Sequence, residues 1–191
     1  MPYTKKLVGT KCYLSPPIPE DAARWTAWLN DLEVAIPLGD EAYTQPTLGE
    51  QQEIIDGISK GHYHIFTIVA REGDEPIGRC GLFGIDQVNR RAMLGIFIGE
   101  KAYWGQGFGQ DAIALLLDYG FGLLNLNSIM LGTMAFNERA INCYRKVGFR
   151  EIGRRREARI VGEKKYDVVL MDILAEEFES PWIVGVVGMS G

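Results

Sequence analysis

The sequence has no excess of positive charge and no long apolar run, and each absence removes a class of protein. Its 191 residues include 20 Lys and Arg against 25 Asp and Glu, a formal net charge of −5. Nucleic-acid binding depends on a concentrated basic field, which this composition does not supply. Even the apolar stretch at residues 182–189 is far shorter than the roughly 20 residues of a membrane-spanning helix. We therefore expect neither nucleic-acid nor membrane binding.

Cysteine and histidine are also scarce. The three cysteines, Cys12, Cys80 and Cys143, have no paired spacing, and the amino terminus lacks the basic-then-apolar pattern of a secretory signal. We expect a cytoplasmic protein with reduced thiols. His62 and His64 share one face of a strand without a third ligand nearby in the sequence, so we predict no metal site.

The hydrophobic pattern predicts one α+β domain over residues 1–191, with residues 181–191 as an apolar tail. Three consecutive strand-like runs at 63–72, 76–86 and 90–100 indicate an antiparallel meander. We expect a mixed, mostly antiparallel sheet of about six to seven strands with a central βαβ crossover. The other expected strands are 11–16, 128–136 and 166–174, and the expected helices are 19–31, 48–61, 138–147 and one that starts near residue 110. The tail is interpreted as an extra strand, a subunit interface or a disordered end.

Three alternating glycines, Gly105, Gly107 and Gly109, stand between an expected strand and the helix that follows it. At such a helix start, unpaired N–H groups and the helix dipole attract anions. A dinucleotide fingerprint would need glycine at Gln110 or Ala112, and a P-loop would need a Gly-Lys-Ser/Thr ending; the sequence has neither. The loop therefore predicts another phosphate-bearing ligand, and the alternative is a sharp turn that only glycine permits.

The segment FNERAINCYRKVGF, residues 136–149, follows one strand later. Together with residues 30–35 and 89–109, it resembles the GNAT superfamily of acetyl-CoA-dependent N-acetyltransferases. The resemblance extends from the first strand to Leu174 and implies a GNAT-type fold. It is greatest to the branch that includes ribosomal-protein amino-terminal acetyltransferases and polyamine acetyltransferases. The chain departs from the family pattern at Trp104, where Arg or Gln is usual.

The resemblance implies acetyl-CoA as co-substrate and indicates which residues would bind it. Backbone N–H groups of the loop would hold the pyrophosphate, so that peptide dipoles rather than lysines attract the anion. A strand would pair with the pantetheine arm, Asn137 would bond its amides, and Arg139 or Arg145 would meet the adenosine phosphates. The expected cofactor residues are Ile96, Phe97, Ile98, Gln106, Gly107, Phe108, Gly109, Gln110, Asn137, Arg139 and Tyr144.

Tyr144 is the expected general acid. When an amine attacks the thioester, negative charge leaves on sulfur, and a phenol within hydrogen-bond reach can protonate it. Outside this motif, ring packing would be the simpler interpretation of Tyr144. Related sequences often have Glu where this chain has Met93, so the general base stays open. The candidates are Glu100, Asp86 and Tyr103, and for each a solvated turn residue is the alternative.

The lack of an identified general base bears on which kind of amine the enzyme can use as acceptor. At pH 7 an α-amine costs about 1 kcal/mol to deprotonate, whereas a lysine-type amine costs about 4.6 kcal/mol. We therefore favour a peptide or protein amino terminus as acceptor, with polyamines and other small amines as alternatives. The acidic segment 39–43 and Glu33 are candidates for attracting a cationic acceptor. An acyl-CoA-binding regulator without activity is the alternative from another functional class, and a homodimer is also expected.

Overall fold

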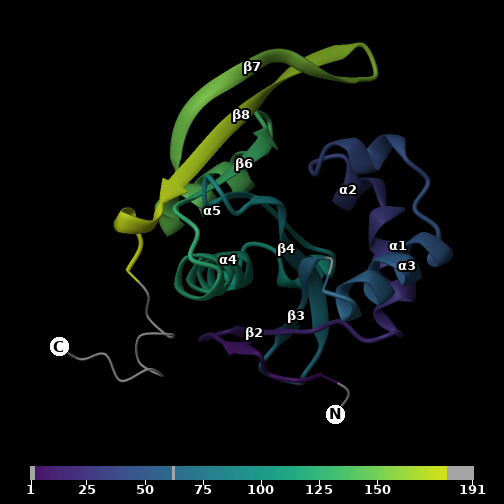
Figure 1. The fold of residues 1–191 in the computed structure, drawn as a ribbon. Helices are drawn as coiled ribbons and strands as arrows, with labels where there is room; N and C mark the ends of the chain where they lie inside the picture. The colour runs from purple at the N-terminus through teal and green to yellow at the C-terminus, as the bar shows by residue number, and fades with distance from the viewer. Residues whose placement is uncertain (1–2, 62, 180–191) are drawn as a thin grey trace.

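An eight-stranded sheet organises this computed structural model, which describes residues 3–61 and 63–179 (Figure 1). In sheet order the strands are β1 (Leu7–Val8), β2 (Cys12–Ser15), β3 (His64–Ala70), β4 (Pro76–Asp86), β5 (Arg91–Ile98), β6 (Ser128–Met134), β8 (Lys164–Leu174) and β7 (Arg150–Val161). Strands β5 and β6 run parallel, and the other neighbouring pairs run antiparallel. The predicted α+β class and the meander, which is β3 to β5, are confirmed.

The sheet has more strands than the sequence predicts, for two physical reasons. Strand β1 is only two residues long, too short for a hydrophobic period. Strand β7 carries mostly charged, exposed side chains and is held by backbone pairing with β8 instead of by a buried face. Alternation of apolar residues could not reveal either strand. The apolar tail at 181–191, and its expected strand or interface, lie outside the described residues.

Helices cover both sides of the sheet (Figure 1). One side carries α1 (Asp21–Leu29), α2 (Leu32–Ala35) and α3 (Leu48–Ser59), and the other carries α4 (Phe108–Asp118) and α5 (Glu138–Val147). Short turns η1 (Asp40–Tyr43), η2 (Lys101–Tyr103), η3 (Tyr119–Leu123) and η4 (Ala175–Glu177) complete the chain. No helix among the described residues is long and apolar enough to cross a membrane.

Each side of the sheet has its own apolar core, and strand alternation decides which residue joins which core. Cys80 of β4 pairs with Ile96 of β5, and both pack in the core beneath α4 and α5. Arg79 and Phe97 pair one position along, so their side chains point to the opposite face. There Phe97 packs edge-on against Trp28, in the core beneath α1 to α3.

The sheet divides between its two parallel strands. Strands β5 and β6 pair only where Arg91 to Met93 oppose Ser128 to Met130. Beyond this point β5 remains hydrogen-bonded to β4 as far as Ile98, while β6 remains hydrogen-bonded to β8 as far as Met134. The far halves of β5 and β6 therefore diverge and leave an opening that connects the two faces of the sheet.

Candidate active site

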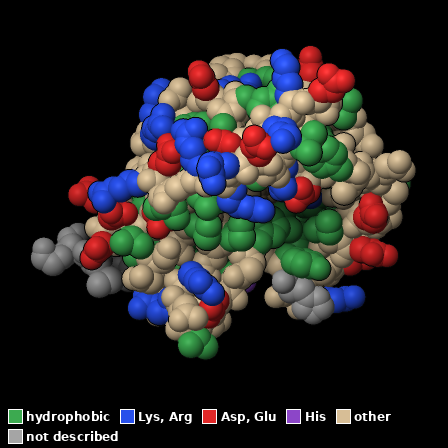
Figure 2. All heavy atoms as spheres, turned by 90° about the horizontal axis from the view of Figure 1, so that it is seen from above, with side chains coloured by type: hydrophobic (Ala, Val, Ile, Leu, Met, Phe, Trp, Pro, Cys, Tyr) green, Lys and Arg blue, Asp and Glu red, His purple; other side chains and the backbone are tan. Residues whose placement is uncertain are grey.

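The opening between β5 and β6 leads into a cavity of about 450 Å³. Its walls are formed by β4 and β5, by the glycine loop with the start of α4, by α5, and by the α2–η1 segment. Figure 2 shows a hollow floored by hydrophobic side chains, with Lys, Arg, Asp and Glu side chains around its rim. Because the walls come from both faces of the sheet, two ligands can meet here from opposite sides.

The glycine loop presents bare backbone to this cavity. Gly105 and Gly107 have φ angles of +74° and +87°, a left-handed conformation that favours glycine. Helix α4 starts at Phe108 with Gly107 as its N-cap, so no side chain caps its first N–H groups. These N–H groups and the helix dipole are suited to a phosphate. The geometry thus fits the pyrophosphate of a coenzyme A molecule.

An acidic residue in the first turn of α4 holds the neighbouring turn of the chain in place. The Asp111 carboxylate accepts hydrogen bonds from the backbone N–H groups of Thr10, Lys11 and Cys12, at 3.0, 2.8 and 2.9 Å. Burial disfavours the ionised carboxylate, but these bonds outweigh it and keep the pKa of Asp111 below its usual value. The side chain of Lys11 is thereby held beside Gly107.

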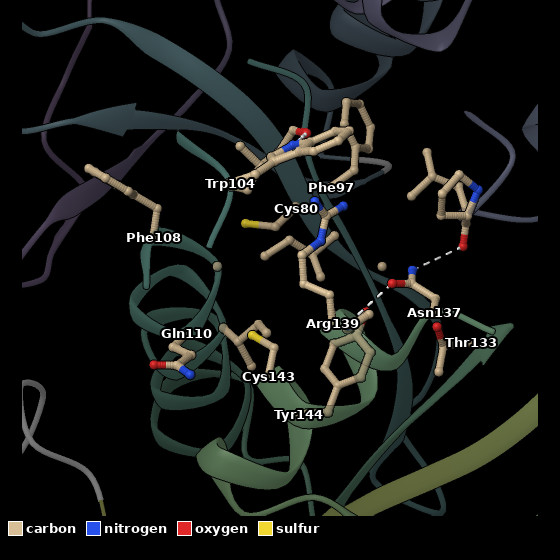
Figure 3. A pocket seen from close by; sticks show the side chains of 18 of the residues that line it. Cys80, Phe97, Trp104, Phe108, Gln110, Thr133, Asn137, Arg139, Cys143 and Tyr144 are labelled. Atoms are coloured by element: carbon tan, nitrogen blue, oxygen red, sulfur yellow. Dashed lines mark hydrogen bonds between the residues drawn. The ribbon is translucent and has the colours of Figure 1, made fainter. Parts of the chain in front are cut away.

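Trp104 closes part of the cavity in place of the family's usual Arg or Gln. Its indole Nε1 donates to the carbonyl oxygen of Ile98 at 2.8 Å, which uses a backbone group at the end of β5. Figure 3 shows Arg139 reaching from α5 to the face of Trp104, and the guanidinium carbon lies 3.9 Å from the ring centroid. Arg139 therefore spans the cavity by a cation–π contact.

Helix α5 contributes the residue expected to act as the acid. Tyr144 lies in the cavity wall and is 8% exposed, and its ring packs edge-on against Phe149. Burial, followed by the neighbouring Cys143, raises the pKa of Tyr144 above its usual value, so the phenol keeps its proton at neutral pH. Asn137 caps α5 by accepting from the N–H of Ala140 at 3.2 Å.

The predicted cofactor residues gather in one place, with one exception. Those that line the cavity are Ile96, Phe97, Ile98, Gly107, Phe108, Gly109, Gln110, Asn137, Arg139 and Tyr144. Gln106 is exposed outside the lining, and its side-chain amide bonds the carbonyl of Ala102. Of the two arginines considered for the adenosine phosphates, Arg139 lines the cavity, whereas Arg145 pairs with Glu151 at 3.3 Å.

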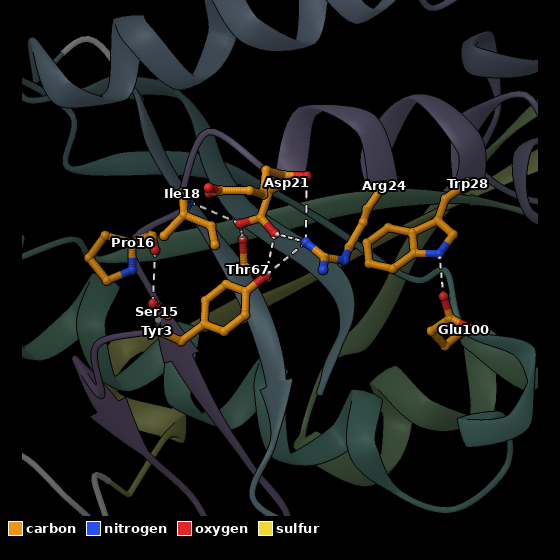
Figure 4. A network of polar contacts seen from close by, with 10 residues as sticks. Tyr3, Ser15, Pro16, Ile18, Asp21, Arg24, Trp28, Thr67 and Glu100 are labelled. Carbon is orange, nitrogen blue, oxygen red and sulfur yellow. Dashed lines mark hydrogen bonds and ion pairs between the residues drawn. The ribbon is translucent and has the colours of Figure 1, made fainter. Parts of the chain in front are cut away.

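Two of the three candidate bases lie outside the cavity, and the third is engaged in a hydrogen bond. Figure 4 shows Glu100 accepting a hydrogen bond from Trp28 Nε1, at 2.8 Å. Asp86 accepts bonds from the backbone and side chain of Asn89 at the β4–β5 turn, at 2.9 and 2.8 Å. Neither carboxylate lines the cavity. Tyr103 does line it, but its hydroxyl donates to Glu75 at 2.6 Å.

Other sequence expectations concern packing and metals. Trp25 and Trp28 pack into the core beneath α1 to α3. His64 Nδ1 lies 2.8 Å from the hydroxyl of Tyr119, and His62 is outside the described residues. Residues 3–61 and 63–179 contain no group of three or more His, Cys, Asp or Glu side chains that could hold a metal ion.

Sequence reasoning missed two charged residues of the cavity, Arg79 and Lys146, and offered Glu41 only as part of the acidic segment 39–43. Glu41 of η1 and Arg79 of β4 both line the wall toward α1 to α3. The sequence does carry a signal for Arg79, because it stands between apolar residues in a strand where alternation predicts a half-buried position. Glu41 is signalled only by the acidic character of its segment, since its place in the cavity wall depends on contacts between distant segments.

Comparisons with known proteins agree with this geometry. The acetyltransferase (GNAT) domain family matches residues 11–150. An uncharacterized N-acetyltransferase, p20 of Bacillus licheniformis, is 32% identical over 178 residues, 92% of this chain and 97% of that protein. A putative ribosomal N-acetyltransferase of Bacillus subtilis is 32% identical over 102 residues, 53% of this chain and 55% of that protein.

Solved structures show the same fold. Spermidine N-acetyltransferase from Vibrio cholerae, determined in complex with CoA and spermine, superimposes with a TM-score of 0.79 at 25% identity. The match covers 88% of this chain and 98% of that chain. The divided sheet, the uncapped glycine loop and the family match lead to one conclusion. The chain belongs to the GNAT acetyltransferase family and is an N-acetyltransferase that uses acetyl-CoA.

Proposed function

We propose that this enzyme acetylates the α-amine at the amino terminus of a peptide or protein. The charge of the cavity carries the proposal. Among the described residues its lining has three basic side chains, Arg79, Arg139 and Lys146, and one acidic side chain, Glu41. Arg139 and Lys146 would face the phosphates of the cofactor, so the acceptor side has one cation, Arg79, and one carboxylate, Glu41. A polycation binds best to several carboxylates together, so this balanced pair favours an acceptor with a single amine, such as an α-amine. The likeness to a putative ribosomal N-acetyltransferase supports the same class of acceptor.

The chain supplies groups for both proton transfers. The amine nitrogen attacks the thioester carbon, a C–N bond forms, the C–S bond breaks and the nitrogen loses one proton. Tyr144 donates its hydroxyl proton to the departing sulfur and recovers a proton from solvent. Glu41 is the proposed acceptor of the amine proton, directly or through water, since it is the acidic side chain of the described lining.

Acetyl-CoA would be held mainly on the α4 side. The N–H groups at the start of α4 would bind its pyrophosphate, and Lys11 lies close enough to Gly107 to add positive charge there. Arg139 and Lys146 would meet the remaining phosphates after Arg139 leaves Trp104. The amine would enter from the α1–α2 side.

Release of free CoA thiol from acetyl-CoA, measured against a panel of amines, tests the proposal. The panel contains amino-terminal peptides, acetyl-blocked lysine peptides, spermidine and an aminoglycoside. We expect release with the amino-terminal peptides. Release with spermidine alone would overturn the assigned acceptor. Binding of acetyl-CoA without release from any amine would favour the regulator alternative.

A further inference from the structure

Arg79 presents a guanidinium to the acceptor side of the cavity. It lies half-buried between two aromatic rings, with its guanidinium carbon 4.8 Å from the centroid of Trp25 and 5.2 Å from that of Phe97. Its Nη1 donates to the side-chain oxygen of Gln51 at 3.0 Å. The aromatic contacts fix the plane of the guanidinium and leave N–H groups at its edge available to a ligand.

Among the residues that the structure describes, this cation has no carboxylate partner. No carboxylate in the described part of the chain lies within 4.0 Å of Arg79, and Glu41 acts on it only at longer range. Burial lowers the pKa of Arg79 to about 10, which reflects how much hydration the guanidinium has lost. A partly buried charge normally has a partner of opposite sign.

Other charges around the acceptor entrance are paired. Lys101 lies 2.8 Å from Asp31 and also contacts Glu33, so one cation is shared by two carboxylates. Asp40 is 2.9 Å from Arg159. Two of the acidic groups that the sequence offered for a cationic acceptor, Glu33 and Asp40, therefore have a cation of the chain beside them. The cation at Arg79 stays unmatched.

The position of Arg79 places its ligand on the acceptor side of the cavity. Arg79 pairs with Phe97 on the part of β5 that has separated from β6. A group bound by Arg79 would therefore lie in the same cavity as the amine.

We infer that the acceptor carries a carboxylate close to its amine and that Arg79 binds this carboxylate. The inference rests on the proposed function and makes its acceptor more specific. The planar guanidinium matches a carboxylate with two parallel hydrogen bonds. The carboxylate has two sources, either the α-carboxylate of a free amino acid or an acidic side chain near a peptide amino terminus.

Matched acceptors in which an amide replaces one carboxylate provide the first test. One pair is alanine and alaninamide, and the other is two amidated peptides with Ala-Asp or Ala-Asn at the amino terminus. We expect kcat/KM for the carboxylate member of one pair to exceed that for its amide by about tenfold or more. The pair that shows the preference identifies the source. Equal values in both pairs would overturn the inference.

Variants separate recognition from packing. Arg79→Gln should abolish the preference for the carboxylate member, mainly through KM, while the dissociation constant for CoA stays unchanged. Arg79→Lys should restore part of the preference, because a point charge still attracts the carboxylate but cannot pair with both oxygens. A preference that persists in a folded Arg79→Gln protein would refute the role.

Binding of the same acceptors to the CoA-loaded protein, measured by calorimetry, separates this inference from the proposed function. If no peptide is acetylated but the Ala-Asp peptide binds about tenfold more tightly than the Ala-Asn peptide, the proposed function fails and the anion site stands. Acetylation of both peptides at equal rates, with equal binding, would leave the proposed function and overturn the anion site.

Discussion

Replacing Gly107 with alanine should weaken CoA binding more than it destabilises the fold. Gly107 has φ +87° and ψ 0°, and an alanine in this left-handed conformation costs about 1–2 kcal/mol. The new Cβ would lie 3.4 Å from Cε of Lys11, which is close to ordinary contact. The cost is therefore backbone strain rather than collision, and it corresponds to a decrease in Tm of roughly 2–8 °C for a chain of this size.

The effect on binding follows from how the strain is relieved. Rotation at Gly107 turns the N–H groups that follow it, which start α4 and are the proposed pyrophosphate ligands. A hydrogen bond to a charged group contributes about 1.5–3 kcal/mol, so loss of one such bond weakens CoA binding roughly 10- to 150-fold. Calorimetric titration with CoA measures this change.

Gly73 provides a matched control. It has φ +82° with nothing within 4 Å of an added Cβ, and it does not line the cavity. Gly73→Ala should therefore reduce Tm as much as Gly107→Ala but leave the affinity for CoA unchanged. Equal CoA affinity in the two variants would refute the role of the loop.

Three other substitutions test separate parts of the account. Asp111→Asn removes acceptors for two backbone N–H groups and should cost about 2–6 kcal/mol of unfolding free energy in urea. Because the folded pKa of Asp111 is depressed, its stabilisation is present above about pH 4 and is lost as pH falls through the folded pKa; a difference from wild type that persists at lower pH would contradict this. Tyr144→Phe should decrease kcat about 10²- to 10⁴-fold with unchanged CoA affinity, and unchanged turnover would exclude the acid role. Glu41→Gln should decrease kcat/KM at neutral pH and recover toward the wild-type rate as pH rises, and an unaltered pH profile would exclude Glu41 as the base.

The sequence predicts those parts of the site that depend on local chain geometry. The glycine loop and the start of α4 could be placed because Gly105 and Gly107 mark a backbone conformation that other residues rarely adopt. The motif at 136–149 gave the place of Asn137 and Tyr144, which the structure brings to the same cavity. The prediction of acetyl transfer from acetyl-CoA came from the resemblance to a family, since the glycine loop alone indicates only that an anionic ligand binds there.

The remaining parts depend on contacts between distant segments. Glu100 looked available in the sequence, but the indole of Trp28, 72 residues earlier, holds its carboxylate. Glu41 and Arg79 line the same cavity only because their distant segments, η1 and β4, come together there, which no local pattern encodes. Strand β7 depends on β8 for its backbone pairing, so its own side chains do not predict it.

Two cysteines line the cavity wall, which raises the question of whether the acetyl group is first transferred to a cysteine and only then to the amine. Cys80 is fully buried and its pKa is raised above the usual value, and burial raises the pKa of Cys143 to about 11. Both thiols are therefore neutral and weakly nucleophilic at pH 7. The opening between β5 and β6 instead brings both substrates together, which favours direct transfer to the amine.

Initial rates measured over a grid of acetyl-CoA and amine concentrations test direct transfer through this cavity. Double-reciprocal plots that intersect are predicted, because both substrates must be bound when the acetyl group moves. Parallel lines, which indicate that an acetylated enzyme forms before the amine binds, would contradict the account.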